Sequence, residues 1–171
     1  MKGEARLKAL KKVTAITIDV LLAIAVLTAL VIVLPNLFGV RTLAVLTGSM
    51  HPNYPVGSMV FVAPEAPENI NPGDPISFVL DRSGNIVTHR VVEADREARS
   101  FITRGDANDV NDGAPVLYDN VLGVVRFHIP MLGYILGFVL TTSGKIIAAT
   151  VIISLIILTM LFSSDKKSAI S

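Results

Sequence analysis

Apolar residues gather at the two ends of this chain, and a more polar middle lies between them. Residues 13–34 read VTAITIDVLLAIAVLTALVIVL, which is 22 positions with a single charge at Asp19. About 20 apolar residues span the hydrocarbon core of a bilayer, whereas a cleavable signal peptide has an apolar core of about 7–15 residues. A buried core helix would need a larger protein around it. We therefore predict a retained transmembrane helix at 13–35, with Asp19 near the headgroups; an intramembrane role for Asp19 is the alternative.

A second apolar run, residues 146–162, reads IIAATVIISLIILTMLF. It has 17 positions without a charge, which is at the low end of what can cross a bilayer. We predict a second transmembrane helix at 145–162. Residues 129–140 are apolar as well. They are predicted either as a strand of the folded domain or as a segment at the membrane interface, and we favour a folded, membrane-proximal position.

Lysine and arginine near the apolar runs predict the orientation, because basic residues are retained on the cytoplasmic side. Five basic residues and one acidic residue precede the first run, and only Arg41 follows it closely. We predict a multi-pass protein of the cell membrane with a cytoplasmic segment at 1–12, an extracytoplasmic domain at 36–144 and a cytoplasmic tail at 163–171. The basic residues are Lys2, Arg6, Lys8, Lys11 and Lys12 before the first run, and Lys166 and Lys167 after the second.

The middle of the chain alternates short runs rich in valine, isoleucine and phenylalanine with turn residues. No stretch of it has a convincing helical period, and short strands with frequent turns are typical of all-β domains. The predicted fold is therefore mainly β: a compact all-β extracytoplasmic domain at 36–144, flanked by an N-terminal and a C-terminal transmembrane helix. Residues 80–86 are predicted as a hairpin loop. The predicted strands are 59–63, 76–80, 86–92, 100–103 and 121–127.

The amino-acid composition excludes several kinds of partner and of catalytic group. The chain is 51% hydrophobic and 17% charged with a mean hydropathy of +0.62, against about 25% charged residues in a typical soluble domain. Its net charge of +1 gives no reason to expect nucleic acid as a partner. The absence of cysteine excludes disulfides, cysteine-ligated zinc and a thiol nucleophile. With only three histidines, a metal site is not expected, and no cofactor is predicted.

A candidate nucleophile lies in the stretch LTGSMHPNYPVGSMVFV, where Ser49 stands between a glycine and a methionine. A serine hydroxyl is a weak nucleophile unless a base removes its proton. No lysine lies between Lys12 and Lys145, so a histidine, which titrates near neutrality, is the more accessible base. His51 is too close along the chain to reach Ser49 easily, and His128 begins an apolar segment.

The third histidine, His89, lies in a predicted strand, on the same face as Val87 and Val91 and opposite Thr88 and Arg90. A polar ring on an apolar face needs a partner. Either a backbone carbonyl binds it in the core, or a carboxylate orients it as a base. Residues 103–112, TRGDANDVND, supply three aspartates. They are a polar loop, or the source of the orienting carboxylate; their spacing does not match a calcium loop.

Together these motifs resemble those of type I signal peptidases, specifically the archaeal and endoplasmic-reticulum class. The resemblance covers almost the whole chain, and its motifs occur in the family's order and spacing. Asn53, His51 and Pro75 depart from the residues that are common in the family. The motifs are Gly48-Ser49-Met50 with Pro52, Pro55-Val56-Gly57-Ser58, Gly73-Asp74-Pro75-Ile76, Thr88-His89-Arg90-Val91, Thr103-Arg104-Gly105-Asp106, and Gly123-x-Val125 leading to Ile129-Pro130-x-Leu132-Gly133.

The resemblance implies roles for single residues. Ser49 would be the nucleophile, and His89 would be the base in the place where the bacterial branch has a lysine. Asp112 is favoured as the partner of His89, with Asp106 structural or supporting; Asp109 has no matching role. The remaining implied roles are the oxyanion hole for Thr47 with the backbone N–H of Ser49, and substrate binding for Met50 and Pro52.

The resemblance also implies a function: a membrane-bound serine endopeptidase that cleaves N-terminal signal peptides from secreted preproteins at the outer membrane face. Its expected partners are preprotein signal peptides, the lipid bilayer and, as a further candidate, the secretion translocon. No nucleic acid is expected. The alternative is a membrane subunit of the same family that is non-catalytic or that processes another, dedicated precursor.

Overall fold

The computed structural model describes residues 2–168, and the chain divides into two compact units. One unit is Leu34–Gly137, and the other contains the helical ends of the chain. Residue 1 and residues 169–171, the end of the predicted cytoplasmic tail, lie outside the described residues. So do the side chains of four lysines on which the predicted orientation partly rests: Lys2, Lys8, Lys166 and Lys167.

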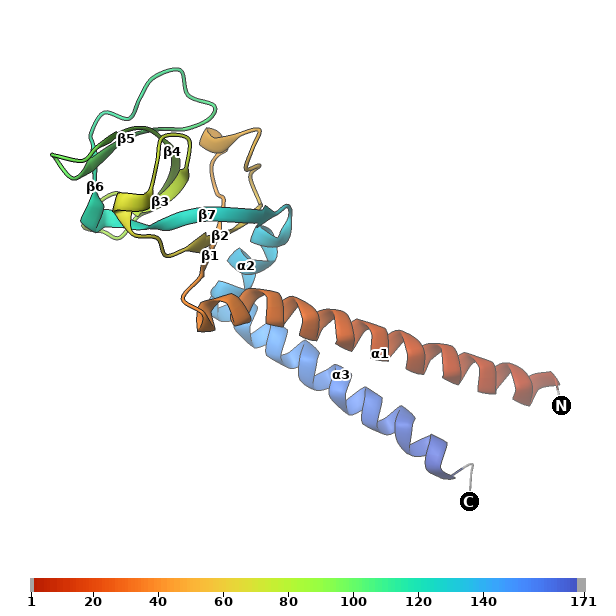
Figure 1. Cartoon of the computed structure of the whole chain (residues 1–171). Coiled ribbons are helices and arrows are strands. Elements are labelled where there is room, and N and C mark those ends of the chain that lie inside the picture. Colours follow the sequence, from red (N-terminus) through yellow and green to blue (C-terminus); the bar gives the residue numbers. More distant parts are fainter. Residues whose placement is uncertain (1, 169–171) are drawn as a thin grey trace. The chain divides into compact units, whose positions relative to one another are not determined.

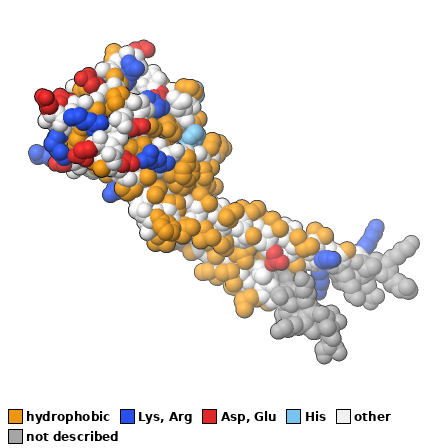
Figure 2. Space-filling view, in the orientation of Figure 1, with side chains coloured by type: hydrophobic (Ala, Val, Ile, Leu, Met, Phe, Trp, Pro, Cys, Tyr) orange, Lys and Arg blue, Asp and Glu red, His pale blue; other side chains and the backbone are white. Residues whose placement is uncertain are grey.

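The helical ends are α1 (Lys2–Leu37) and α3 (Thr142–Ser168). Each contains a stretch long and apolar enough to cross a membrane, 29 residues at Ala9–Leu37 and 20 residues at Thr142–Leu161. The prediction of two apolar terminal helices is confirmed, although both extend beyond the predicted 13–35 and 145–162. On the face that Figure 2 shows, hydrophobic side chains predominate along these helices, with a few charged groups towards the chain ends, whereas most charged side chains gather on the β-rich unit. Two such helices fit a membrane protein.

The β-rich unit is built on one seven-stranded antiparallel sheet that curls on itself (Figure 1), in the order β1-β2-β7-β3-β4-β5-β6. The mainly-β prediction is confirmed, and the predicted hairpin loop at 80–86 connects β3 to β4. The strands are β1 (Arg41–Ala44), β2 (Met59–Ala63), β3 (Pro75–Val79), β4 (Ile86–Asp95), β5 (Ser100–Arg104), β6 (Val116–Leu117) and β7 (Val121–Ile129).

Register irregularities accompany the curl of the sheet. The pairing shifts between Phe61 and Val62 in β2 and between Ser77 and Phe78 in β3, both against β7. Bulges of this kind bend a strand and increase its twist, which is how a sheet closes towards a barrel. β7 has nine residues and pairs with both β2 and β3, so it joins the two halves of the sheet.

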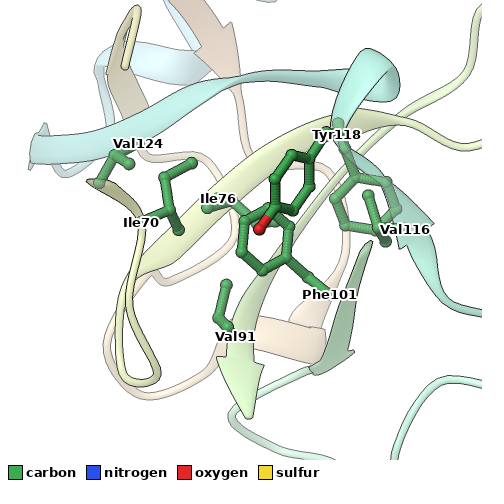
Figure 3. Close-up of a cluster of buried hydrophobic side chains, with 8 residues drawn as sticks. Ile70, Ile76, Val91, Phe101, Val116, Tyr118 and Val124 are labelled. Carbon is green, nitrogen blue, oxygen red and sulfur yellow. The ribbon is translucent and has the colours of Figure 1, made fainter. Parts of the chain in front are cut away.

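The core on the inner side of β3, β4 and β5 is apolar and well packed (Figure 3). Phe101 stacks on Tyr118 with ring centroids 4.8 Å apart. Val91 of β4 is 2% exposed, and Val87 of the same strand packs against this cluster. Alternate residues of a strand share a face, so position 89 lies at the edge of this core. The fold thereby fixes where His89 can point.

The prediction that the domain at 36–144 contains only strands is wrong for one segment. Ile129 ends β7, but Leu132–Leu140 form a helix, α2, so the strand alternative for 129–140 does not hold beyond its first residue. The sequence LGYILGFVL is short and has no charged side chain, so no alternation of polar and apolar positions reveals a helical period. The two-residue β6 and the four-residue β1 were also too short to stand out.

The start of α2 packs closely on the turn before β2. The N–H of Gly133 donates to the carbonyl of Gly57 at 2.9 Å. Gly57 has a φ of +83°, and a Cβ there would overlap the ring of Tyr134. Both the backbone conformation and the ring therefore require glycine at this position.

We expect Gly57→Ala to destabilise the protein by about 1–3 kcal/mol more than Gly84→Ala. Gly84 has nearly the same φ, +81°, but open space around its Cβ position. Its variant therefore carries only the left-handed backbone cost of about 1–2 kcal/mol. Thermal unfolding of the full chain in detergent measures both variants, and equal losses would show that the ring contact does not constrain this turn.

Candidate active site

Ser49 lies in a short 3₁₀ turn, η1 (Gly48–Met50), that follows β1. Met50 is 2% exposed and anchors the turn, and the N–H of His51 closes it onto the carbonyl of Gly48 at 3.0 Å. The Ser49 side chain is partly exposed. Its hydroxyl oxygen is 3.3 Å from the hydroxyl oxygen of Thr47. The turn thus presents two neighbouring hydroxyl groups at the surface.

His89 lies in β4 opposite Ile76 of β3. Its side chain is 12% exposed, and its Nδ1 is 2.6 Å from Oδ2 of Asp112. Its strand face is the one predicted, shared with Val87 and Val91, which contact the core. The partner that this face requires is a carboxylate rather than a backbone carbonyl.

The hydrogen bond to Asp112 fixes which ring nitrogen of His89 carries the proton. An ionised carboxylate can only accept, so Nδ1–H is the donor. In the neutral ring, Nε2 then has a free lone pair, which is the form that can remove a proton from another group. The orientation is therefore suited to a general base.

Asp112 is held in turn by Thr103 of β5. The backbone N–H of Asp112 donates to the carbonyl of Thr103 at 2.8 Å, and the Thr103 hydroxyl donates to Oδ2 of Asp112 at 2.6 Å. Thr103 is fully buried at 0% exposure, opposite Val91 in the register of the sheet. The position of the carboxylate is thus set by a strand and not by the loop alone.

The loop that follows β5 also binds the backbone of Ser49. The N–H of Ala107 donates to the carbonyl of Ser49 at 2.8 Å, and a Cβ at Gly105 would lie 2.6 Å from that same carbonyl oxygen. η1 lies against β4. Residues 105–112 therefore contact the turn that carries Ser49 and include the side chain that orients His89.

Asp106 belongs to a separate ion pair on the other face of β4. Its two oxygens accept from Nε and Nη2 of Arg90 at 2.8 and 2.7 Å, and Asn53 donates to Oδ2 at 2.8 Å. Its side chain is only 9% exposed. Burial alone would raise the pKa of Asp106, but the hydrogen bonds from Arg90 and Asn53 outweigh burial and lower that pKa. Among residues 2–168, His89 is not a hydrogen-bond partner of Asp106.

The structure brings some of the predicted residues together and leaves others apart. His89 and Asp112 are bonded, as are Thr47 and Ser49. Within the described residues no hydrogen bond joins Ser49 to His89. The substrate-binding roles of Met50, which is buried, and Pro52, which is exposed, stay predictions.

Three residues that contact the site were given no role in it by the sequence analysis. They are Thr103, Arg90 and Asn53, which bind the two aspartates. A signal existed for Arg90, because it follows His89 and must point to the opposite face of the strand. For Thr103 and Asn53 the sequence gives no comparable signal, since their partners are set by the loop conformation.

A cavity of about 300 Å³ adjoins the histidine. His89 and Asp112 form part of its wall, and the rest comes from apolar side chains of the β3–β4 hairpin, residues 113–116 and Asn120. Within the described part of the chain, no cluster of three histidine or carboxylate side chains is arranged to hold a metal ion.

Comparison with known proteins shows which proteins this chain is similar to. The chain is 37% identical over 90 residues to signal peptidase I W of Bacillus subtilis (strain 168), covering 51% of this chain and 47% of the relative. It is 30% identical over 101 residues to the signal peptidase complex catalytic subunit SEC11 of Yarrowia lipolytica (strain CLIB 122 / E 150), covering 53% of this chain and 58% of the relative. No protein-family model matches the chain.

The chain thus spans about half the length of the curated relatives it matches. Both relatives are signal peptidases, one bacterial and one the catalytic subunit of a complex. The two similarities agree with the resemblance of the sequence motifs to those of type I signal peptidases. The two apolar helices agree with a membrane protein of this kind.

The lowered pKa of Asp106 predicts part of the acid sensitivity of the fold. Because this pKa is lower in the folded chain than in the unfolded one, the stabilisation is fully present above the unfolded value of about 4 and is lost as pH falls through the folded value. We expect Asp106→Asn to be less stable than the wild type at pH 7 and to lose less stability as the pH falls below about 4. The melting temperature as a function of pH measures this.

Asp109→Asn is the matched control, because it removes the same charge from the same loop at an exposed position. It should retain the acid sensitivity of the wild type. If both variants gave the same pH dependence, the ion pair with Arg90 would not be a source of stability.

Proposed function

We propose that this protein is a membrane-bound serine endopeptidase that cleaves signal peptides from preproteins at the outer face of the membrane, with Ser49 as nucleophile and His89 as general base. The observation that carries the proposal is the 2.6 Å hydrogen bond between His89 and Asp112, in a chain similar to two signal peptidases. The loop that supplies Asp112 also binds the carbonyl of Ser49.

In the first half of the reaction the Ser49 oxygen attacks the scissile carbonyl, and its proton passes to Nε2 of His89. Asp112 stabilises the imidazolium and keeps its own negative charge. The tetrahedral intermediate then collapses, and His89 returns the proton to the leaving amine. Water then attacks the carbonyl of the acyl-enzyme while Nε2 of His89 removes a proton from that water. The ester bond breaks, and His89 returns the proton to the Ser49 oxygen.

For the first step the Ser49 hydroxyl must leave Thr47 and turn towards the imidazole. Catalytic hydrogen bonds are often absent or long in a free enzyme and form in the substrate complex. Thr47 would then be free to donate its own proton to the developing oxyanion, together with the backbone N–H of Ser49. The 3.3 Å pair of hydroxyl groups is in this view the resting state of the site.

The position of Ser49 in the chain suits a substrate that emerges from the bilayer. Ser49 is 15 residues beyond Leu34, near the end of the first apolar helix. The apolar core of a signal peptide occupies the membrane, and its cleavage site lies at the surface. The alternative of a non-catalytic subunit is less favoured, because the chain has both the serine and the oriented histidine.

Ser49→Ala and His89→Gln should each reduce kcat by about 10⁴-fold or more, because nucleophile and base act as one unit. Asp112→Ala should reduce kcat by a somewhat smaller factor. Cleavage of a preprotein by the full chain in detergent or proteoliposomes measures the rate, and mass spectrometry of the new amino terminus identifies the bond that is cut.

Ser83→Ala is the matched control for the serine, because Ser83 lies in the exposed β3–β4 hairpin loop. It should keep the wild-type rate. A Ser49→Ala protein that processes the preprotein at the wild-type rate would end the proposal. Cleavage only of an unrelated precursor, with Ser49 required, would instead support the dedicated-precursor alternative.

Thr47→Val should reduce kcat by about 10²–10³-fold with little change in KM, because an oxyanion-hole donor acts mainly in the transition state. Thr47→Ser keeps the hydroxyl and should restore most of the rate. If Thr47→Val had the activity of the wild type, the backbone N–H of Ser49 would have to act with some other donor.

A further inference from the structure

One buried hydroxyl group has no role in the reaction described so far. Thr103 is fully buried at 0% exposure near the end of β5, and its hydroxyl donates to Asp112 at 2.6 Å. Its backbone carbonyl also accepts the N–H of Asp112 at 2.8 Å. A single strand residue therefore fixes both the backbone and the side chain of the aspartate.

Both hydrogen bonds to the Asp112 side chain go to the same oxygen atom. Oδ2 accepts from Nδ1 of His89 at 2.6 Å and from Oγ1 of Thr103 at 2.6 Å. A carboxylate oxygen shares its negative charge among the donors that bind it, so each bond weakens the other. The threonine hydroxyl and the imidazole thus compete for one charge.

Thr103 is well suited to hold this position. Its side chain is β-branched and therefore has few rotamers, and its strand pairs with β4 two residues beyond His89, at Val91. Asp112 is 24% exposed in a loop, so without a second contact its carboxylate has room to move away from the ring.

We propose that Thr103 is a positioning residue that sets how strongly His89 acts as a base, by holding Asp112 and taking part of its charge. This inference rests on the proposed function. Removal of the hydroxyl has two effects. Asp112 loses a restraint on its position, so fewer molecules have a correctly oriented imidazole. In those that do, the whole charge of Oδ2 faces the ring and favours its protonated form.

The charged groups around His89 define the pH dependence that follows. Asp112 faces the ring directly. The Arg90–Asp106 pair lies on the other face of β4, and His89 contributes, less than Arg90 and Asn53 do, to the lowered pKa of Asp106. Ile76 and Phe78 of β3 are uncharged. Only the contact with Asp112 changes when the Thr103 hydroxyl is removed, so the acidic limb of the pH–rate profile reports on that contact.

The test compares Thr103→Val and Thr103→Ser with the wild type in the full chain. For Thr103→Val we expect kcat to fall about tenfold with KM unchanged, and the acidic limb of kcat/KM to move up by about half a pH unit or more, because less His89 is neutral. Thr103→Ser retains the donor and should return both quantities to within about twofold of the wild type. If Thr103→Val does not fold, Thr103→Ala removes the same hydroxyl without adding volume.

The matched control is Thr88→Val, which removes a hydroxyl next to His89 in the same strand. The Thr88 hydroxyl is 2.7 Å from the Ser77 hydroxyl, and no hydrogen bond joins it to Asp112 within the described residues. This variant should leave the acidic limb in place. If Thr103→Val lost stability but had the wild-type pH profile, or if Thr88→Val moved the limb equally, the proposal would be wrong and Thr103 would be only a core residue.

A second readout separates this proposal from the proposed function. NMR titration of the His89 ring in wild type and Thr103→Val needs no peptidase activity. A titration that moves to higher pH in Thr103→Val supports the coupling even if no preprotein is cleaved, whereas an unchanged titration in an active enzyme overturns the coupling and leaves the peptidase assignment intact.

Discussion

The site depends on one hydrogen bond, between Nδ1 of His89 and Oδ2 of Asp112. It connects a strand whose neighbours are apolar with a loop that is polar and exposed. The imidazole would otherwise be a polar group at the rim of an apolar core, which costs free energy unless it is paired. The hydrogen bond to Asp112 offsets this cost and also fixes the tautomer of the His89 ring. Stability and chemistry therefore impose the same geometry here.

The loop after β5 carries most of the organisation around that bond. It provides the N–H that binds the carbonyl of Ser49, the carboxylate that binds His89, and the carboxylate that binds Arg90. It is held at its base by Thr103, a buried strand residue. The catalytic groups that we propose thus come from three separate segments, but their relative positions are set by one. Loops positioned by a rigid sheet commonly carry function in this way.

Much of this could be predicted from the sequence, and the failures have physical causes. Short runs rich in valine, isoleucine and phenylalanine between turn residues identified the central strands, and uniform hydropathy identified the terminal helices. The helix α2 was missed because a short segment without charged side chains has no contrasting positions. The face of His89 followed from strand alternation. The pairing of Asp106 with Arg90 did not, because partners of loop side chains depend on a backbone path that no local pattern encodes.

His89 and Arg90 are consecutive in β4, and each takes a different aspartate from the same loop, one on either face of the strand. Which aspartate each side chain binds therefore depends on whether its position in the strand is odd or even. Shortening β4 by a single residue ahead of this pair would exchange the two faces and offer a guanidinium to Asp112, whereas lengthening it by one residue would bring Thr88 to that place. The hairpin at Asp81–Asn85 can vary in length without this consequence. In a redesigned protein, an insertion at the tip of the Asp81–Asn85 hairpin should therefore be tolerated, whereas an insertion between that tip and position 89 should not.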